Sequence, residues 1–129
     1  MRTFPTAFFA CTMAFAAVPA ISGTGFEPYS PRALERALDD GKAVVVHVNA
    51  PWCEVCRRQI GVLDALLAEP EFRAVRAIRI EVDLDRKAAG RLSMANESAI
   101  LVIRDGDITA ASLNEADVAA LRKELRTGL

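Results

Sequence analysis

Two cysteines separated by two residues are the clearest chemical feature of this chain. Cys53 and Cys56 follow Trp52 and the apolar run 43–49, which is rich in valine and is predicted to form a buried strand. A helical pattern follows them. A cysteine at the start of a helix lies among unpaired N–H donors at the positive end of the helix dipole, and both favour the nucleophilic thiolate. The spacing therefore predicts a thiol–disulfide redox site.

The helical pattern gives the two cysteines different roles. The helix is expected to begin around Cys53 and to run to about residue 69, because Pro70 ends it. One face carries residues at offsets of four, three and four, namely Cys56, Ile60, Leu63 and Leu67. Cys56 is therefore predicted to be buried, and Cys53 remains reachable at the helix tip. We expect Cys53 to attack a substrate and Cys56 to resolve the product.

The N-terminal segment resembles a secretory signal. Arg2 is the only charge before Glu27, and residues 4–18 are almost wholly apolar or small. Small residues around position 20 favour cleavage after Ala20, so residues 1–20 are assigned as the signal peptide. The apolar run is shorter than the roughly 20 residues of a membrane-spanning helix. An uncleaved segment that anchors the protein in the membrane is the alternative.

Cleavage would also remove Cys11, which leaves only the pair at 53 and 56. A disulfide across so short a loop contributes little stability, so a reversible redox couple explains the pair better than a structural link. The chain has 129 residues, a formal net charge of −1 and 52% hydrophobic residues. These values suit a single domain and give no reason to expect a nucleic-acid partner. No oligomer interface is evident, so a monomer is expected.

The remaining pattern alternates helices and strands. Residues 21–29 form a short lead expected to be flexible, and Ser30 with Pro31 begins a helix that Gly41 ends. Strands are predicted at 77–83, 99–103 and 108–111, with a short helix at 85–92 and a hairpin turn at 105–106. Asn114 or Ser112 is expected to cap a final amphipathic helix.

This order of elements around Trp-Cys-x-x-Cys resembles the thioredoxin superfamily, from residue 30 to the C-terminus. The hairpin at 104–107 and the final helix strengthen the resemblance, and Gly41-Lys42 before the strand resembles exported thioredoxin-like proteins and the periplasmic module of membrane thiol-electron transporters. The resemblance implies an α/β, thioredoxin-like fold in one domain over 30–129. Its central mixed sheet would have about four strands flanked by helices.

Three positions depart from the family pattern. His47 replaces a buried acid, Ser98 replaces a cis-proline, and Glu54-Val55 lies between the cysteines. His47 is either a general base for Cys56 or a hydrogen-bonded core residue, and a cation at Arg79 would lower its pKa. Ser98 either presents its backbone and hydroxyl to a bound thiol, or is an ordinary polar residue, or opens the thiolates to a metal ion.

The residues around Cys53 are expected to bind substrate and adjust its reactivity. Trp52 and Pro51 are predicted to flank Cys53 and contact partners. Glu54 would raise the pKa of Cys53, and Arg57 with Arg58 would oppose that effect.

The leading functional prediction is a periplasmic thiol–disulfide oxidoreductase that reduces substrate disulfides. It would need no cofactor beyond the redox-active disulfide Cys53–Cys56, and its partners would be protein thiols and disulfides. The resemblance implies a membrane thiol-electron transporter as its electron donor. The alternative is a thiolate metal-binding protein or copper chaperone that uses the same pair, since soft thiolates suit Cu(I). A non-catalytic interaction domain is a third possibility, which the intact cysteines disfavour.

Overall fold

A five-stranded mixed sheet organises the protein, in the order β1-β3-β2-β4-β5. The computed structural model describes residues 25–91 and 96–129, so the predicted signal peptide lies outside the described residues. The parallel strands are β1 (Phe26–Pro28), β3 (Arg76–Glu81) and β2 (Val44–Asn49). The antiparallel strands are β4 (Ala99–Arg104) and β5 (Asp107–Leu113). The expected thioredoxin-like α/β fold is confirmed, with one more strand than expected.

The additional strand is β1, which the sequence analysis placed in the lead at 21–29. Its register pairs Phe26 with Ala77 and Pro28 with Arg79, and Phe26 is buried. Three residues are too few to show an alternating pattern, and proline disfavours a strand prediction. Proline is tolerated here because β1 is an edge strand.

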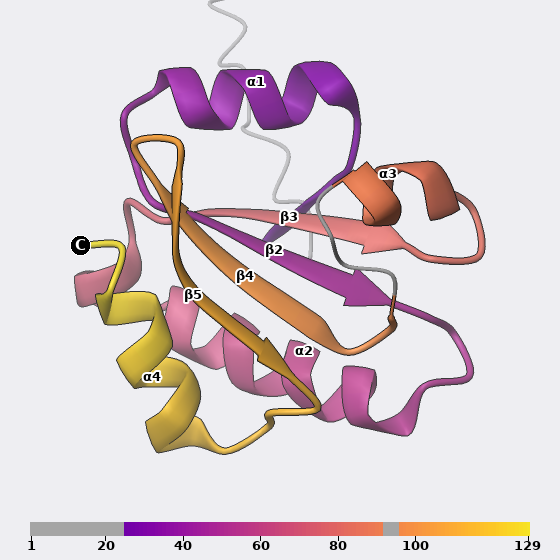
Figure 1. Ribbon diagram of the computed structural model, residues 1–129. Helices are drawn as coiled ribbons and strands as arrows, with labels where there is room; N and C mark the ends of the chain where they lie inside the picture. The colour runs from indigo at the N-terminus through magenta and orange to yellow at the C-terminus, as the bar shows by residue number, and fades with distance from the viewer. Residues whose placement is uncertain (1–24, 92–95) are drawn as a thin grey trace, which may run out of the picture.

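Helices cover both faces of the sheet (Figure 1). The helices α1 (Pro31–Asp39) and α3 (Arg86–Arg91) contact β3 on one face. The helices α2 (Glu54–Leu67) and α4 (Val118–Arg126) pack together on the other, next to the short 3₁₀ helix η1 (Pro70–Phe72). The side chains of β2 alternate between the faces, so Val44, Val46 and Val48 join one core cluster and Val45 joins the other.

The start of α1 confirms the sequence prediction, whereas the predicted cap of the last helix is wrong. The hydroxyl of Ser30 accepts the N–H of Ala33 at 3.1 Å, with proline in the first turn. Asp117 caps α4 through the N–H of Ala120 at 2.9 Å. Asn114 cannot do so, because it occupies the turn after β5 with φ +61°, and Ser112 belongs to β5 itself.

The chain reverses between β4 and β5 at the predicted Asp105-Gly106 turn. Both residues have positive φ, 53° and 86°, which suits a two-residue hairpin connection. Within the described residues, no helix is both long enough and apolar enough to cross a membrane.

Candidate active site

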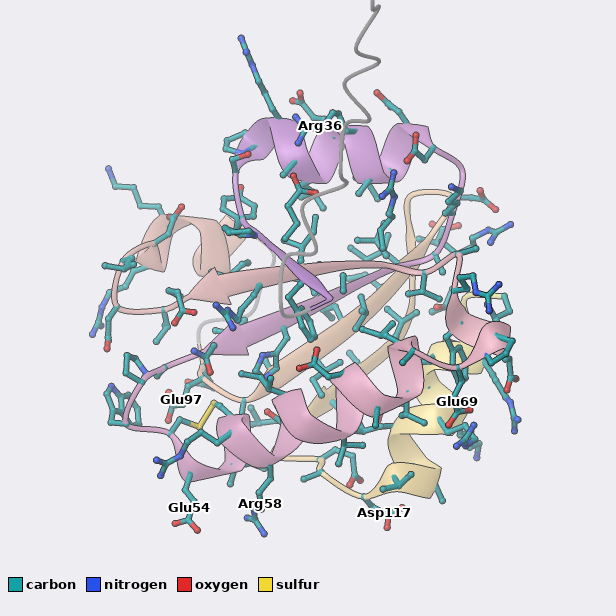
Figure 2. All side chains as sticks on the ribbon, turned by 180° about the vertical axis from the view of Figure 1, so that it is seen from behind. Arg36, Glu54, Arg58, Glu69, Glu97 and Asp117 are labelled. Atoms are coloured by element: carbon teal, nitrogen blue, oxygen red, sulfur yellow. A yellow bond between two sulfur atoms is a disulfide. The ribbon has the colours of Figure 1, made fainter. Side chains whose placement is uncertain are left out.

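The redox pair lies where β2 passes into α2. Cys53 is the N-cap of α2, and its sulfur accepts the backbone N–H of Cys56 at 3.1 Å. The two residues form a disulfide with Cα atoms 5.3 Å apart, visible in yellow in Figure 2. Cys53 retains 7% exposure, whereas Cys56 has none. The difference in burial and the helix N-terminus agree with the order of reaction expected from the sequence.

The carbonyl oxygen of Val48 joins Cys56 to the start of β4. It lies 3.8 Å from the sulfur of Cys56, where the thiol of the reduced form can donate a weak hydrogen bond. It also accepts the backbone N–H of Ser98 at 2.9 Å. The backbone of Ser98 and the sulfur of Cys56 therefore lie against the same carbonyl oxygen.

The outer side of the site carries an exposed aromatic residue. Trp52 is 62% exposed, and its indole N–H donates to Asp83 at 3.1 Å. Pro51 is exposed beside it. Figure 2 shows Glu54 and Arg58 extending outward from α2, away from the disulfide. Trp52 and Pro51 therefore offer contact surface next to Cys53.

His47 lies inside the protein, on the face of β2 that α2 covers. It has no exposed surface, and its Nε2 lies 2.9 Å from the side-chain oxygen of Gln59. Burial lowers the pKa of His47 from its usual 6.5, and the charge of Arg79, its register partner on β3, lowers it further. The hydrogen bond to Gln59 and the charge of Glu81 oppose these effects. Burial and the charge of Arg79 therefore both favour the neutral form of the His47 imidazole.

Gln59 is the site residue that the sequence analysis missed. Its amide N–H groups donate to the carbonyl oxygens of Ser98 at 2.9 Å and Glu115 at 2.8 Å. The buried face of α2 consists of Cys56, Gln59, Leu63 and Leu66, whereas Ile60 and Leu67 are only half-buried. The predicted face is one residue out of register at both positions, and at the first of them the reason is that a glutamine is not counted as a core residue. Its place one turn after Cys56 is the signal that could have revealed it.

The N–H, the carbonyl and the hydroxyl of Ser98 each form a hydrogen bond within the protein. It is 1% exposed and has φ +64°. Its hydroxyl donates to the side-chain oxygen of Asn114, and its carbonyl accepts the Asn114 backbone N–H at 3.2 Å as well as the Gln59 amide. None of the described peptide bonds is cis. The N–H and O–H donors of Ser98 are therefore both used within the protein, and its hydroxyl oxygen keeps acceptor capacity.

Across the described ranges 25–91 and 96–129, no three His, Cys, Asp or Glu side chains are grouped to hold a metal ion. The predicted metal-binding alternative uses the sulfurs of the two cysteines, and in the structure both sulfurs are bonded to each other in the disulfide. A two-coordinate thiolate site would first require reduction.

Comparisons with known proteins agree with this geometry. No family model matches the chain. The crystal structure of Trxlp from Edwardsiella tarda EIB202 is similar with a TM-score of 0.74 and 33% identity, over 76% of this chain and 95% of that one. Thioredoxin of Bacillus subtilis (strain 168) is 28% identical over 74 residues, which are 57% of this chain and 70% of that protein. Thioredoxin from Fasciola hepatica has a TM-score of 0.65 at 26% identity, over 74% of this chain and 91% of that one.

The chain belongs to the thioredoxin superfamily, and its Cys53–Cys56 disulfide makes it a thiol–disulfide oxidoreductase. Proteins of this kind act on protein thiols and disulfides, and thioredoxins carry electrons on the cysteine pair without a cofactor.

Proposed function

We propose that this protein is an exported reductase of protein disulfides that works in the periplasm. The observation that carries the proposed chemistry is the asymmetry of the cysteine pair. Cys53 caps α2, accepts an N–H bond and keeps some exposure, whereas Cys56 is fully buried behind it. Such a pair suits attack by the outer thiolate and resolution by the inner one.

The proposed reaction has two steps. The thiolate of Cys53 attacks a substrate disulfide, so that one substrate sulfur leaves as a thiolate and a mixed disulfide forms. Cys56 then attacks the sulfur of Cys53 and releases the second substrate sulfur. The substrate gains two electrons, and the protein ends as the Cys53–Cys56 disulfide seen in the structure. His47 is proposed to accept the proton of Cys56, and Trp52 with Pro51 to contact the substrate.

The signal-like sequence over residues 1–20 supports the proposed export. An exported reductase works in a compartment that favours disulfides, so it needs electrons from the other side of the membrane. We therefore assign it a membrane thiol-electron transporter as donor.

The experiment that tests the cysteine roles is a trap. In Cys56→Ser the mixed disulfide cannot be resolved, so partners should remain covalently bound to Cys53 and be released by reductant. Cys53→Ser is the matched control and should trap none. Trapping by Cys53→Ser and not by Cys56→Ser would reverse the assignment.

The direction of electron flow needs a separate measurement, the reduction potential against glutathione buffers. A value near or below about −200 mV supports a reductase, whereas a value near about −120 mV would make the protein a disulfide donor and refute the proposed direction. Export is tested by fractionating cells that express the full chain. Recovery of a shortened protein in the periplasm supports it, and recovery in the cytoplasm at full length contradicts it.

A further inference from the structure

The side-chain amide of Gln59 has one possible orientation. Its nitrogen lies 2.9 Å from the carbonyl oxygen of Ser98 and 2.8 Å from that of Glu115. Carbonyl oxygens only accept hydrogen bonds, so both contacts require the amide N–H groups. The side-chain oxygen of Gln59 is therefore the atom that lies 2.9 Å from Nε2 of His47.

This orientation decides the tautomer of His47. An amide oxygen only accepts, so Nε2 must carry the proton and donate it to Gln59. A neutral imidazole has one N–H, which leaves the lone pair on Nδ1. That atom is buried and has no hydrogen-bond partner among the described residues.

The same contacts fix the imidazole to the two elements that carry the resolving cysteine and its carbonyl acceptor, α2 and β2. Gln59 follows Cys56 by one helical turn on the buried face of α2. His47 precedes Val48, whose carbonyl oxygen lies 3.8 Å from the sulfur of Cys56. The charged groups that act on the imidazole are Arg79 and Glu81 of β3, which pair with each other at 2.9 Å.

We infer that Gln59 is a positioning residue, which fixes His47 as the Nε2–H tautomer and keeps Nδ1 free to accept the proton of Cys56. The inference rests on the proposed function and specifies its resolving step. The thiol of Cys56 gives its proton to Nδ1, and the new thiolate attacks the sulfur of Cys53. The bond from Cys53 to the substrate breaks, its electron pair leaves with the substrate sulfur, and that thiolate takes up the proton from Nδ1.

The tautomer can be observed directly, because His47 is the only histidine in the chain. Nitrogen NMR of the histidine-labelled protein at neutral pH should show a protonated Nε2 and an unprotonated Nδ1 in both redox forms. In Gln59→Met, which keeps the side-chain volume and removes the amide, the two tautomers should mix. A protonated Nδ1 in the wild type, or an unchanged spectrum in Gln59→Met, would overturn the inference.

The kinetic test uses dithiobis(nitrobenzoate), a symmetrical disulfide that releases one coloured thiolate at each step. The first release reports attack by Cys53, and the second reports resolution by Cys56. His47→Ala should slow the second release by roughly a hundredfold and Gln59→Met by about tenfold, since a positioned base contributes about 10² or more. Neither change should slow the first release by more than about twofold. Equal second-release rates in Gln59→Met and the wild type would refute the role of Gln59.

Two controls separate positioning from loss of stability. Leu66→Ala removes a buried side chain about two turns after Gln59 on the same helix, so it should lower the unfolding free energy and leave both releases unchanged. In a His47→Ala background, Gln59→Met should produce no further slowing, whereas an added tenfold loss would show that Gln59 acts without His47. Failure of the proposed function appears differently, as a wild type that releases no second thiolate.

Discussion

Proline at position 98 would restore the residue that the thioredoxin family usually has there, yet we expect Ser98→Pro to destabilise this protein strongly. Ser98 has φ +64°, and the proline ring fixes φ near −65°. Proline also lacks the N–H that Ser98 donates to the carbonyl of Val48 at 2.9 Å. The backbone that serves serine here is therefore incompatible with proline.

The expected loss has three contributions. Removal of the N–H leaves the buried carbonyl of Val48 without this donor, which costs about 1–3 kcal/mol. The lost hydroxyl bond to Asn114 costs about 1 kcal/mol. The incompatible φ adds about 1 kcal/mol or more. The unfolding free energy should therefore fall by at least about 3 kcal/mol, which corresponds to a decrease in Tm of roughly 12 °C or more for a domain of this size.

Urea unfolding of the oxidised protein, followed by far-UV circular dichroism, measures this loss. Ser98→Gly is the control, because glycine adopts positive φ freely and its relief of strain should nearly offset the lost hydroxyl bond. Ser98→Ala keeps the strain and loses the bond, so it should cost about 1 kcal/mol. A Ser98→Pro variant as stable as the wild type would show that the loop accommodates a proline, and the reasoning from φ and the Val48 bond would be wrong.

Three further predictions concern packing, pH and capping. A Cβ on Gly128 would lie 2.8 Å from the Cβ of Ala43, so Gly128→Ala should lower the unfolding free energy by about 1–3 kcal/mol. A Cβ on Gly61 would meet no atom within 4 Å, so Gly61→Ala should stabilise α2 by about 0.5–1 kcal/mol. Urea unfolding measures both effects. The pKa of His47 is lowered from 6.5 in the folded protein, so the unfolded chain binds the proton more readily. The unfolding free energy should therefore fall as pH drops below 6.5, by up to about 1.4 kcal/mol per pH unit until the folded pKa is reached. A His47→Gln variant whose unfolding free energy depends on pH in the same way between pH 6.5 and 5 would contradict this assignment. Asp117→Ala should lower the unfolding free energy by about 0.5–2 kcal/mol, and no change in thermal unfolding would mean that α4 does not depend on this cap.

Local rules predicted the elements that depend on neighbouring residues. Ser30 and Pro31 specify the start of α1 whatever surrounds them, and the Asp105-Gly106 turn requires little beyond its own dihedral angles. The position of Cys53 at a helix tip follows from the same rules. These features therefore appeared in the structure as predicted.

The features that were missed depend on contacts between distant parts of the chain. The buried amide of Gln59 forms hydrogen bonds with His47 of β2, with Ser98 before β4 and with Glu115 before α4. These partners are distant in the sequence, so no local pattern predicts the burial of Gln59. The strand β1 exists because β3 offers it a paired edge. Asn114 has the composition of a helix cap, but its bond to Ser98 commits it to the turn.

The carbonyl oxygen of Val48 links the redox state of Cys56 to the backbone amide of Ser98, because it contacts both groups. In the disulfide form this oxygen receives one donor, the amide of Ser98, while the sulfur beside it carries no hydrogen. Reduction adds a thiol that donates to the same oxygen and so competes for its electron density. The chemical shift of the Ser98 amide proton should therefore change when the disulfide is reduced, which makes this amide a probe of the redox state.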